Sequence, residues 1–184
     1  MELMELTATE LVERFHLAGC VWIDPPLRRE ELEYLTAFTE SRRWRRPGGP
    51  YAVPDNPLAE CLDPALDLAL YTTPPAGQPS VYCPWTPARA GHALALRQDV
   101  AGGHGVPPHE VAAWLAYLRD HFLRPGALAA QSNEPAFAGF GFDHVLQGAA
   151  AVCSEWTGLV TVLQVEANDI TVLTFGRHAP TGRA

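Results

Sequence analysis

Residues 142–175 read FDHVLQGAAAVCSEWTGLVTVLQVEANDITVLTF, and this stretch decides the fold. It holds three apolar segments rich in β-branched residues, which are typical of strands. The segments cover residues 142–153, 159–165 and 170–175. Two short polar sequences separate them, WTG at 156–158 and ND at 168–169, and these residue types favour tight turns. The stretch therefore predicts three consecutive antiparallel strands.

Two segments upstream carry the periodicity of helices. In residues 28–41, Leu32, Leu35 and Phe38 recur at helical spacing behind an acidic first turn. Residues 108–124 begin with a proline that suits a first turn and continue with one apolar stripe. Weaker patterns predict further elements, namely strands at 15–23, 81–85 and 92–97 and short helices at 7–14 and 62–70.

The order of the main elements predicts the fold class. A strand, a helix, two strands, a second helix and three strands are typical of an α+β fold. We expect a single α+β domain over residues 1–184, in which an antiparallel sheet carries two main helices on one face as a ferredoxin-like variant. An apolar content of 47% and a charged content of 18% are those of an ordinary globular chain.

The location of the protein is predicted from its charge and hydropathy. No apolar run approaches the roughly 20 residues that span a bilayer. Residues 1–13 are acidic, unlike the basic and then apolar start of a signal peptide. We therefore expect a cytoplasmic protein with no membrane partner. The net charge of −8 argues against a nucleic-acid binder with a wholly basic surface, although all 13 basic residues are arginine.

Residues 47–90 are predicted to form a long proline-rich excursion rather than a second domain. Ten of the 17 prolines lie there, and proline does not fit the centre of a sheet. Long loops in compact domains often bind partners or ligands. Tyr51, Tyr71 and Tyr82 are spaced along the excursion, which favours contact with a partner protein.

The run Arg42-Arg43-Trp44-Arg45-Arg46 is the most conspicuous local motif. Four guanidinium groups around an indole can hold a phosphate, a nucleic-acid backbone or an acidic partner, with Trp44 stacking on a base. The second interpretation is structural: arginines at a helix C-terminus complement its dipole, and Trp44 packs under their stems. The sequence favours this second interpretation, because runs of charge usually lie on solvated faces.

His121, Asp143 and His144 are the weak candidates for catalysis. Histidines and carboxylates can form a metal site or an acid–base pair. However, neighbours in a strand point to opposite faces, so Asp143 and His144 are not expected to enter one site. A structural histidine is the favoured interpretation. The four cysteines lack zinc or redox spacing, and we predict neither a metal nor a cofactor.

Several longer strings carry a resemblance to a known family. They are IDPPL at 23–27, ELEYL at 31–35, GPY at 49–51, PPAGQPS at 74–80, CPW at 83–85, WLAYL at 114–118, DHFL at 120–123, PGA at 125–127 and FDHVL at 142–146. Through them the chain resembles a family of small uncharacterised bacterial proteins, mainly actinobacterial, over most of residues 18–175. The resemblance implies fold and cytoplasmic origin but no activity. The chain departs from it at 97–108, where relatives carry an acidic, aromatic turn, so a site at that turn would be altered here.

These observations leave three classes of function open. We expect a small non-catalytic binding or accessory protein that contacts another protein, as an inhibitor, an immunity factor or an accessory subunit does. We also expect it to form a homodimer through an exposed sheet edge. The first alternative is a ligand-binding protein or enzyme with a pocket near His121, Asp143 and His144. The second is a nucleic-acid-associated protein that uses residues 42–46.

Overall fold

The computed structural model describes residues 12–46, 48–54 and 71–176 and contains one six-stranded antiparallel sheet. Its strands lie in the order β2-β3-β1-β4-β5-β6. The strand bounds are β1 Phe15–Asp24, β2 Trp85–Pro87, β3 Ala93–Leu96, β4 Val145–Ser154, β5 Val160–Glu166 and β6 Asp169–Phe175. The two main helices are α1 Arg29–Glu40 and α3 Pro108–Leu118. The α+β prediction is confirmed.

The topology is a ferredoxin-like unit with an added hairpin. In the described residues, the strands and main helices up to β4 run β1-α1-β2-β3-α3-β4, and these strands lie in the order β2-β3-β1-β4 with every neighbouring pair antiparallel. This is the split β-α-β arrangement. The β5–β6 hairpin then extends the sheet beyond β4. The sequence predicted both the order of the elements and this class of topology.

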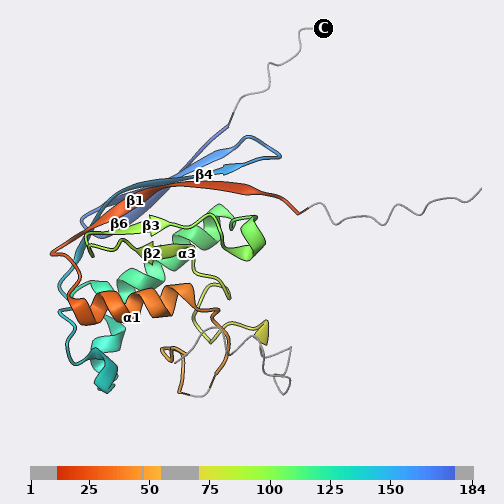
Figure 1. Ribbon diagram of the computed structural model, residues 1–184. Helices are drawn as coiled ribbons and strands as arrows, with labels where there is room; N and C mark the ends of the chain where they lie inside the picture. Colours follow the sequence, from red (N-terminus) through yellow and green to blue (C-terminus); the bar gives the residue numbers. More distant parts are fainter. Residues whose placement is uncertain (1–11, 47, 55–70, 177–184) are drawn as a thin grey trace, which may run out of the picture.

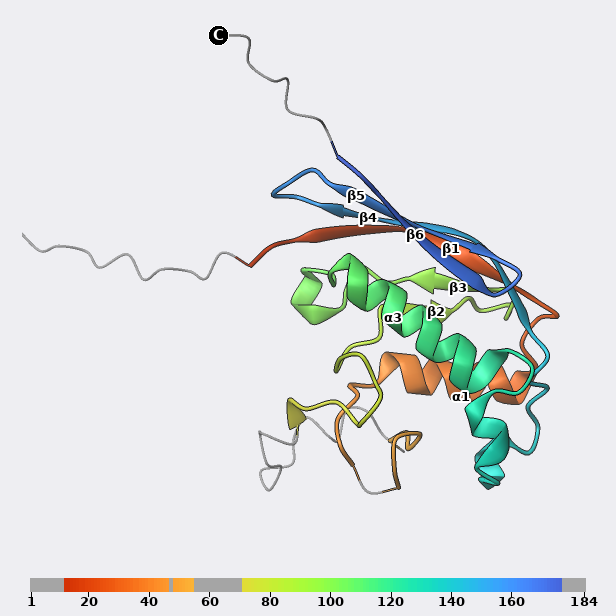
Figure 2. The same ribbon diagram turned by 180° about the vertical axis from the view of Figure 1, so that it is seen from behind.

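Both main helices lie on one side of the sheet, in the view of Figure 1 and from behind in Figure 2. The core fills the space between these two layers. Its largest fully buried apolar side chains come from the helices, from β2 to β5 and from η3 (Arg119–Leu123), the turn after α3: Phe38, Trp85, Trp114, Phe122, Leu146 and Leu163. Burying large aromatic and aliphatic side chains is the main stabilising term of such a fold.

Some element boundaries differ from the predictions. The short edge strand is Trp85–Pro87 rather than 81–85, and it pairs with β3 through Trp85 and Leu96. The fourth strand starts at Val145, because Phe142 has a positive φ of 50° that no ladder accommodates. Residues 12–14 are not helical. The rest of the helix predicted at 7–14, and the one at 62–70, lie outside the described residues.

The second predicted helix is α-helical only as far as Leu118. Residues 108–118 are α-helical, and η3 continues them as a π-helical turn. A π-turn changes the side-chain spacing of a helix and is often found at functional sites. Here it places His121 and Phe122 beside the excursion.

In the part of the chain that the structure describes, no helix is long and apolar enough to cross a bilayer.

Candidate interaction surface

His121 pairs with a tyrosine of the excursion. Its Nδ1 lies 2.8 Å from the hydroxyl of Tyr51, and its ring stacks on Tyr117 with centroids 3.8 Å apart. Burial lowers the pKa of His121, and the charge of Asp120 offsets this only in part. A neutral imidazole between two phenol rings is suited to holding the excursion on the helical layer.

His144 occupies a separate and fully buried position beside α1. Its Nε2 lies 3.1 Å from Oε1 of Glu31, and its Nδ1 lies 2.6 Å from the carbonyl oxygen of Pro25. Asp143 is exposed to solvent. The three predicted catalytic residues therefore have different surroundings, and the structure does not bring them together into one site.

Arg43 is fully buried and acts as a clamp between α1 and the excursion. Its guanidinium donates to the carbonyl oxygens of Pro50 and Ala52 at 2.8 and 3.0 Å. It also donates to Gln78 Oε1 at 3.2 Å and lies 3.9 Å above the Phe38 ring. Burial, with a smaller effect of Arg46, lowers the pKa of Arg43 to about 10. These hydrogen bonds are those of a structural arginine.

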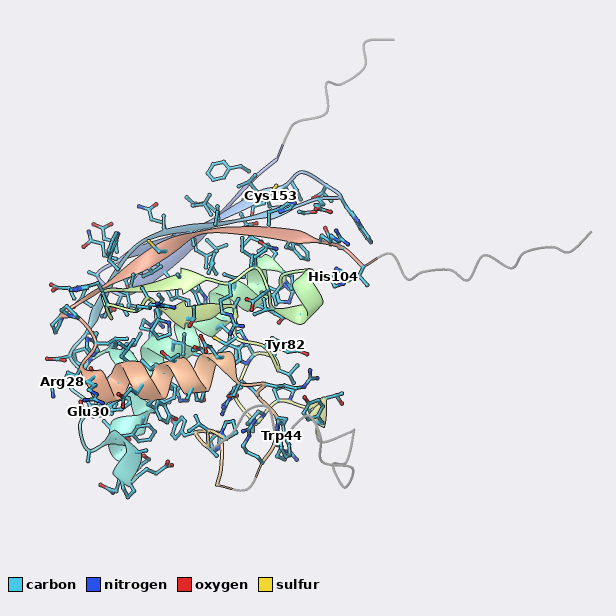
Figure 3. The ribbon with its side chains drawn as sticks, viewed as in Figure 1. Arg28, Glu30, Trp44, Tyr82, His104 and Cys153 are labelled. Carbon is cyan, nitrogen blue, oxygen red and sulfur yellow. The ribbon has the colours of Figure 1, made fainter. Side chains whose placement is uncertain are left out.

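Two further arginines of the run, Arg42 and Arg46, stack on aromatic rings. Arg42 lies between Tyr71 and Tyr82, with its guanidinium carbon 4.3 and 4.7 Å from the two ring centroids. Arg46 lies 5.1 Å from the Trp44 ring. Trp44 and Tyr82 lie beside the C-terminal end of α1 (Figure 3).

The structure thus brings most predicted binding residues into one structural cluster. Arg42 and Trp44 are half-buried, Arg43 and Arg46 are buried, and only Arg45 of the run is exposed. Cation–π contacts of this kind contribute to packing. The run therefore presents one exposed guanidinium rather than a basic face of four.

Two of the predicted site residues, Arg45 and Arg46, line a cavity of about 150 Å³. A groove of about 670 Å³ lies between α1 and β2, and its walls mix apolar side chains with Glu33, Glu40 and Arg89. None of its lining residues is a predicted site residue. Among the described residues, no three histidine, cysteine, aspartate or glutamate side chains gather as a metal site requires.

The sheet face opposite the helices carries the largest feature that the sequence analysis missed. Residues paired across antiparallel strands lie on the same face. One row joins Ala18, Ala151, Val162 and Leu173, and the row beside it joins Cys153, Val160 and Phe175. Their neighbours in sequence, such as Val152 and Leu163, are buried on the helical side.

We name these outward residues the open-face patch. It comprises Ala18, Cys20, Trp22, Ala149, Ala151, Cys153, Val160, Val162, Leu173 and Phe175. Small side chains occupy its middle, and large ones stand at its borders. Trp22, Leu173 and Phe175 are 59%, 41% and 56% exposed. No helix in the described part of the chain covers this face (Figures 1 and 2).

Polar and charged groups surround the open-face patch, and the row of Cys20 and Ala149 continues into Gln164 and Thr171. At one end, Nε2 of His16 lies 2.8 Å from Oε1 of Glu155. Asp24 lies at the opposite end of β1, and Glu166 pairs with Asp169 at the hairpin turn. An apolar centre inside a polar rim is the usual anatomy of a protein interface.

The sequence held a signal for this surface. Each outward row alternates with a buried one, so the strands are apolar on both faces, as in VTVLQV at 160–165. A sheet with one solvated face alternates apolar and polar residues instead.

No protein-family model, curated protein or solved structure matches the chain.

Proposed function

We propose that this protein is a non-catalytic binding protein that acts through contact with another protein, as an inhibitor, an immunity factor or an accessory subunit does in the cytoplasm. The open-face patch carries this proposal. Monomeric soluble proteins rarely leave large contiguous apolar patches in water, and such patches mark interaction sites. Trp22, Leu173 and Phe175 supply the aromatic and aliphatic anchors on which binding energy usually concentrates.

The chemistry of the patch favours a protein over other ligands. Its centre is uncharged, and a nucleic acid needs a positive surface for its phosphates. The chain as a whole has a net charge of −8. Small-molecule sites are concave and enclose most of their ligand, whereas this surface follows the face of a sheet. A flat apolar centre with a charged rim fits a partner protein best.

The proposal is tested by comparing the parent with Trp22→Ser/Leu173→Ser. Each protein is recovered gently from its own host and weighed by native mass spectrometry. We expect the parent to carry a stoichiometric second protein, and the double variant to lose it. Both substitutions replace exposed side chains, so the fold should stay intact.

Leu128→Ser is the matched control. Leu128 is also an exposed aliphatic residue, 47% accessible, but it lies in the 3-10 turn Leu128–Gln131, which is not part of the sheet. This control should keep the partner. Recovery of the parent as a bare 20.0 kDa chain with a small-molecule or metal adduct would contradict the proposal and favour the ligand-binding alternative.

A further inference from the structure

The two edges of the sheet differ in how they are protected. The β2 edge is only three residues long, ends in Pro87 and packs on α1. The β6 edge is seven residues long, and residues 171–175 are all exposed. Natural sheets protect their edges with short strands, prolines, charges or covering elements. Within the described residues β2 has such protection, whereas β6 has only Asp169 at its start and a small contact with α3, and its residues 171–175 stay exposed.

The sequence of β6 also favours pairing. Residues 170–175 read ITVLTF, with no charge, proline or glycine. Such β-branched and aromatic segments have a high propensity for pairing. Val172, on the helical side, and Leu173, on the open side, are 49% and 41% exposed. The edge therefore offers apolar side chains on both faces together with its backbone.

The hairpin geometry identifies which backbone groups point outward. Ala167 and Asn168 have φ of 48° and 74°, as in a two-residue type I′ turn. Such a turn closes on a hydrogen-bonded pair, here Glu166 and Asp169, and the pattern then alternates along the ladder. The N–H and C=O groups of Ile170, Val172 and Thr174 therefore point away from β5.

We infer that β6 pairs antiparallel with β6 of a second copy, about a two-fold axis at Val172. The two Val172 residues then exchange both of their outward hydrogen bonds. Ile170 of each copy does the same with Thr174 of the other, and Leu173 lies opposite Thr171. The two sheets become one continuous sheet. This contact is made by the backbone of β6, the strand that also carries Leu173 and Phe175 of the open-face patch. It does not rest on the proposed function, which concerns a different partner.

The charge pattern of β6 is compatible with pairing between two copies. The chain carries a net charge of −8, so most contacts between two copies bring like charges together. Along β6 the only charge is Asp169, and the two-fold register places it opposite Phe175. Like charges facing each other across strands destabilise a sheet, and this register has none within the paired strands.

The test compares the mass in solution of the parent, Val172→Pro and Val172→Thr by sedimentation velocity over a range of concentrations. Proline removes the outward N–H that the second copy requires, and no bond to β5 is lost. Threonine keeps this N–H and the β-branched shape. We expect a dimer of twice 20.0 kDa for the parent and Val172→Thr. The dissociation constant should rise roughly 100-fold for Val172→Pro.

Val172→Lys guards against a folding defect in the proline variant. Its side chain is exposed in the monomer, but the two-fold axis places the two lysines opposite each other, so the dimer should be lost. A parent that stays monomeric at millimolar concentration would overturn the inference. A dimer that withstands Val172→Lys and is lost in Trp22→Ser, a change on β1 and not on β6, would place the second copy on the open face instead.

Discussion

The imidazole of His144 is held between the carboxylate of Glu31 and the carbonyl of Pro25, at 3.1 and 2.6 Å, in full burial. A carbonyl oxygen only accepts, so Nδ1 of His144 carries a proton. Glu31 accepts two further bonds, from the backbone N–H groups of Arg28 and Gly141, which favour its charged form. The contact is therefore an imidazolium–carboxylate pair that ties β1, α1 and β4 together.

Removing one member of this pair should destabilise the fold strongly. Glu31→Ala leaves the buried His144 without its counter-charge and removes the capping interaction at Arg28. We expect the free energy of unfolding to fall by about 3–5 kcal/mol, measured by urea denaturation. Glu33→Ala is the matched control, because Glu33 forms an exposed ion pair with Arg29 on the same helix. Its cost should stay below about 1 kcal/mol, and equal losses would contradict this account.

The stability that the pair contributes should depend on pH in both directions. Burial is the largest effect and opposes charge on His144, but the bonds to Glu31 and to the Pro25 carbonyl, with the charges of Glu31 and Asp143, together raise the His144 pKa above 6.5. The contribution of His144 is thus complete below pH 6.5 and is lost as the pH rises through its folded pKa. Burial likewise opposes charge on Glu31, but its hydrogen bonds hold its pKa below 4.5.

The contribution of Glu31 is therefore present above pH 4.5 and is lost as the pH falls through its lower folded pKa. The difference in unfolding free energy between the parent and Glu31→Gln should be largest between pH 4.5 and pH 6.5. Urea denaturation at a series of pH values measures it. A difference that stays constant from acid to alkaline pH would show that the pair is not ionic.

The pKa values of His121 and His144 should be shifted in opposite directions from that of an ordinary histidine. Burial lowers the pKa of His121 below 6.5, whereas the pair with Glu31 raises that of His144. NMR titration of the imidazole carbon-bound protons checks this, with His121→Gln and His144→Gln to assign the resonances. A midpoint for His121 above that of His144 would contradict the assigned environments.

Arg43 should matter for stability and Arg45 should not. Arg43→Met removes the donors to Pro50, Ala52 and Gln78. The buried Gln78 and the half-buried Ala52 lose these bonds, whereas the Pro50 carbonyl keeps its bond from Gln78 Nε2. We expect a loss of roughly 2–4 kcal/mol. Arg45 is exposed, so Arg45→Met should change stability by less than about 0.5 kcal/mol. Thermal unfolding followed by circular dichroism compares the two variants. A larger loss of stability for Arg45→Met than for Arg43→Met would contradict the structural role of Arg43.

The fold could be predicted because its signals are local. Helical periodicity, proline at element ends and turn residues lie within single segments, and they were sufficient for the order of strands and helices. The boundary errors arose where a backbone constraint is not visible in composition, as at Phe142 with its positive φ. The strand at 81–85 was placed too early because Tyr82 and Cys83 have strand-like side chains without a pairing partner in the sheet.

The site could be predicted only in part, because burial depends on contacts between distant segments. Arg43 reads as a surface charge, yet Pro50 and Gln78 enclose it. Nothing near Glu31 in sequence indicates His144, which lies more than a hundred residues away. The open-face patch was visible as strands apolar on both faces, but the sequence analysis used this pattern only to predict strands.

The most direct test of the central claim asks whether the open-face patch is covered in the cell. Cys153 lies on this face and is half-buried, whereas burial raises the pKa of Cys83 to about 12. Maleimide labelling, localised by peptide mass spectrometry, compares Cys153 in host extract with Cys153 in dilute purified protein, and Cys83 serves as the unreactive internal control. The account predicts slower labelling of Cys153 in the extract. Equal rates would contradict it.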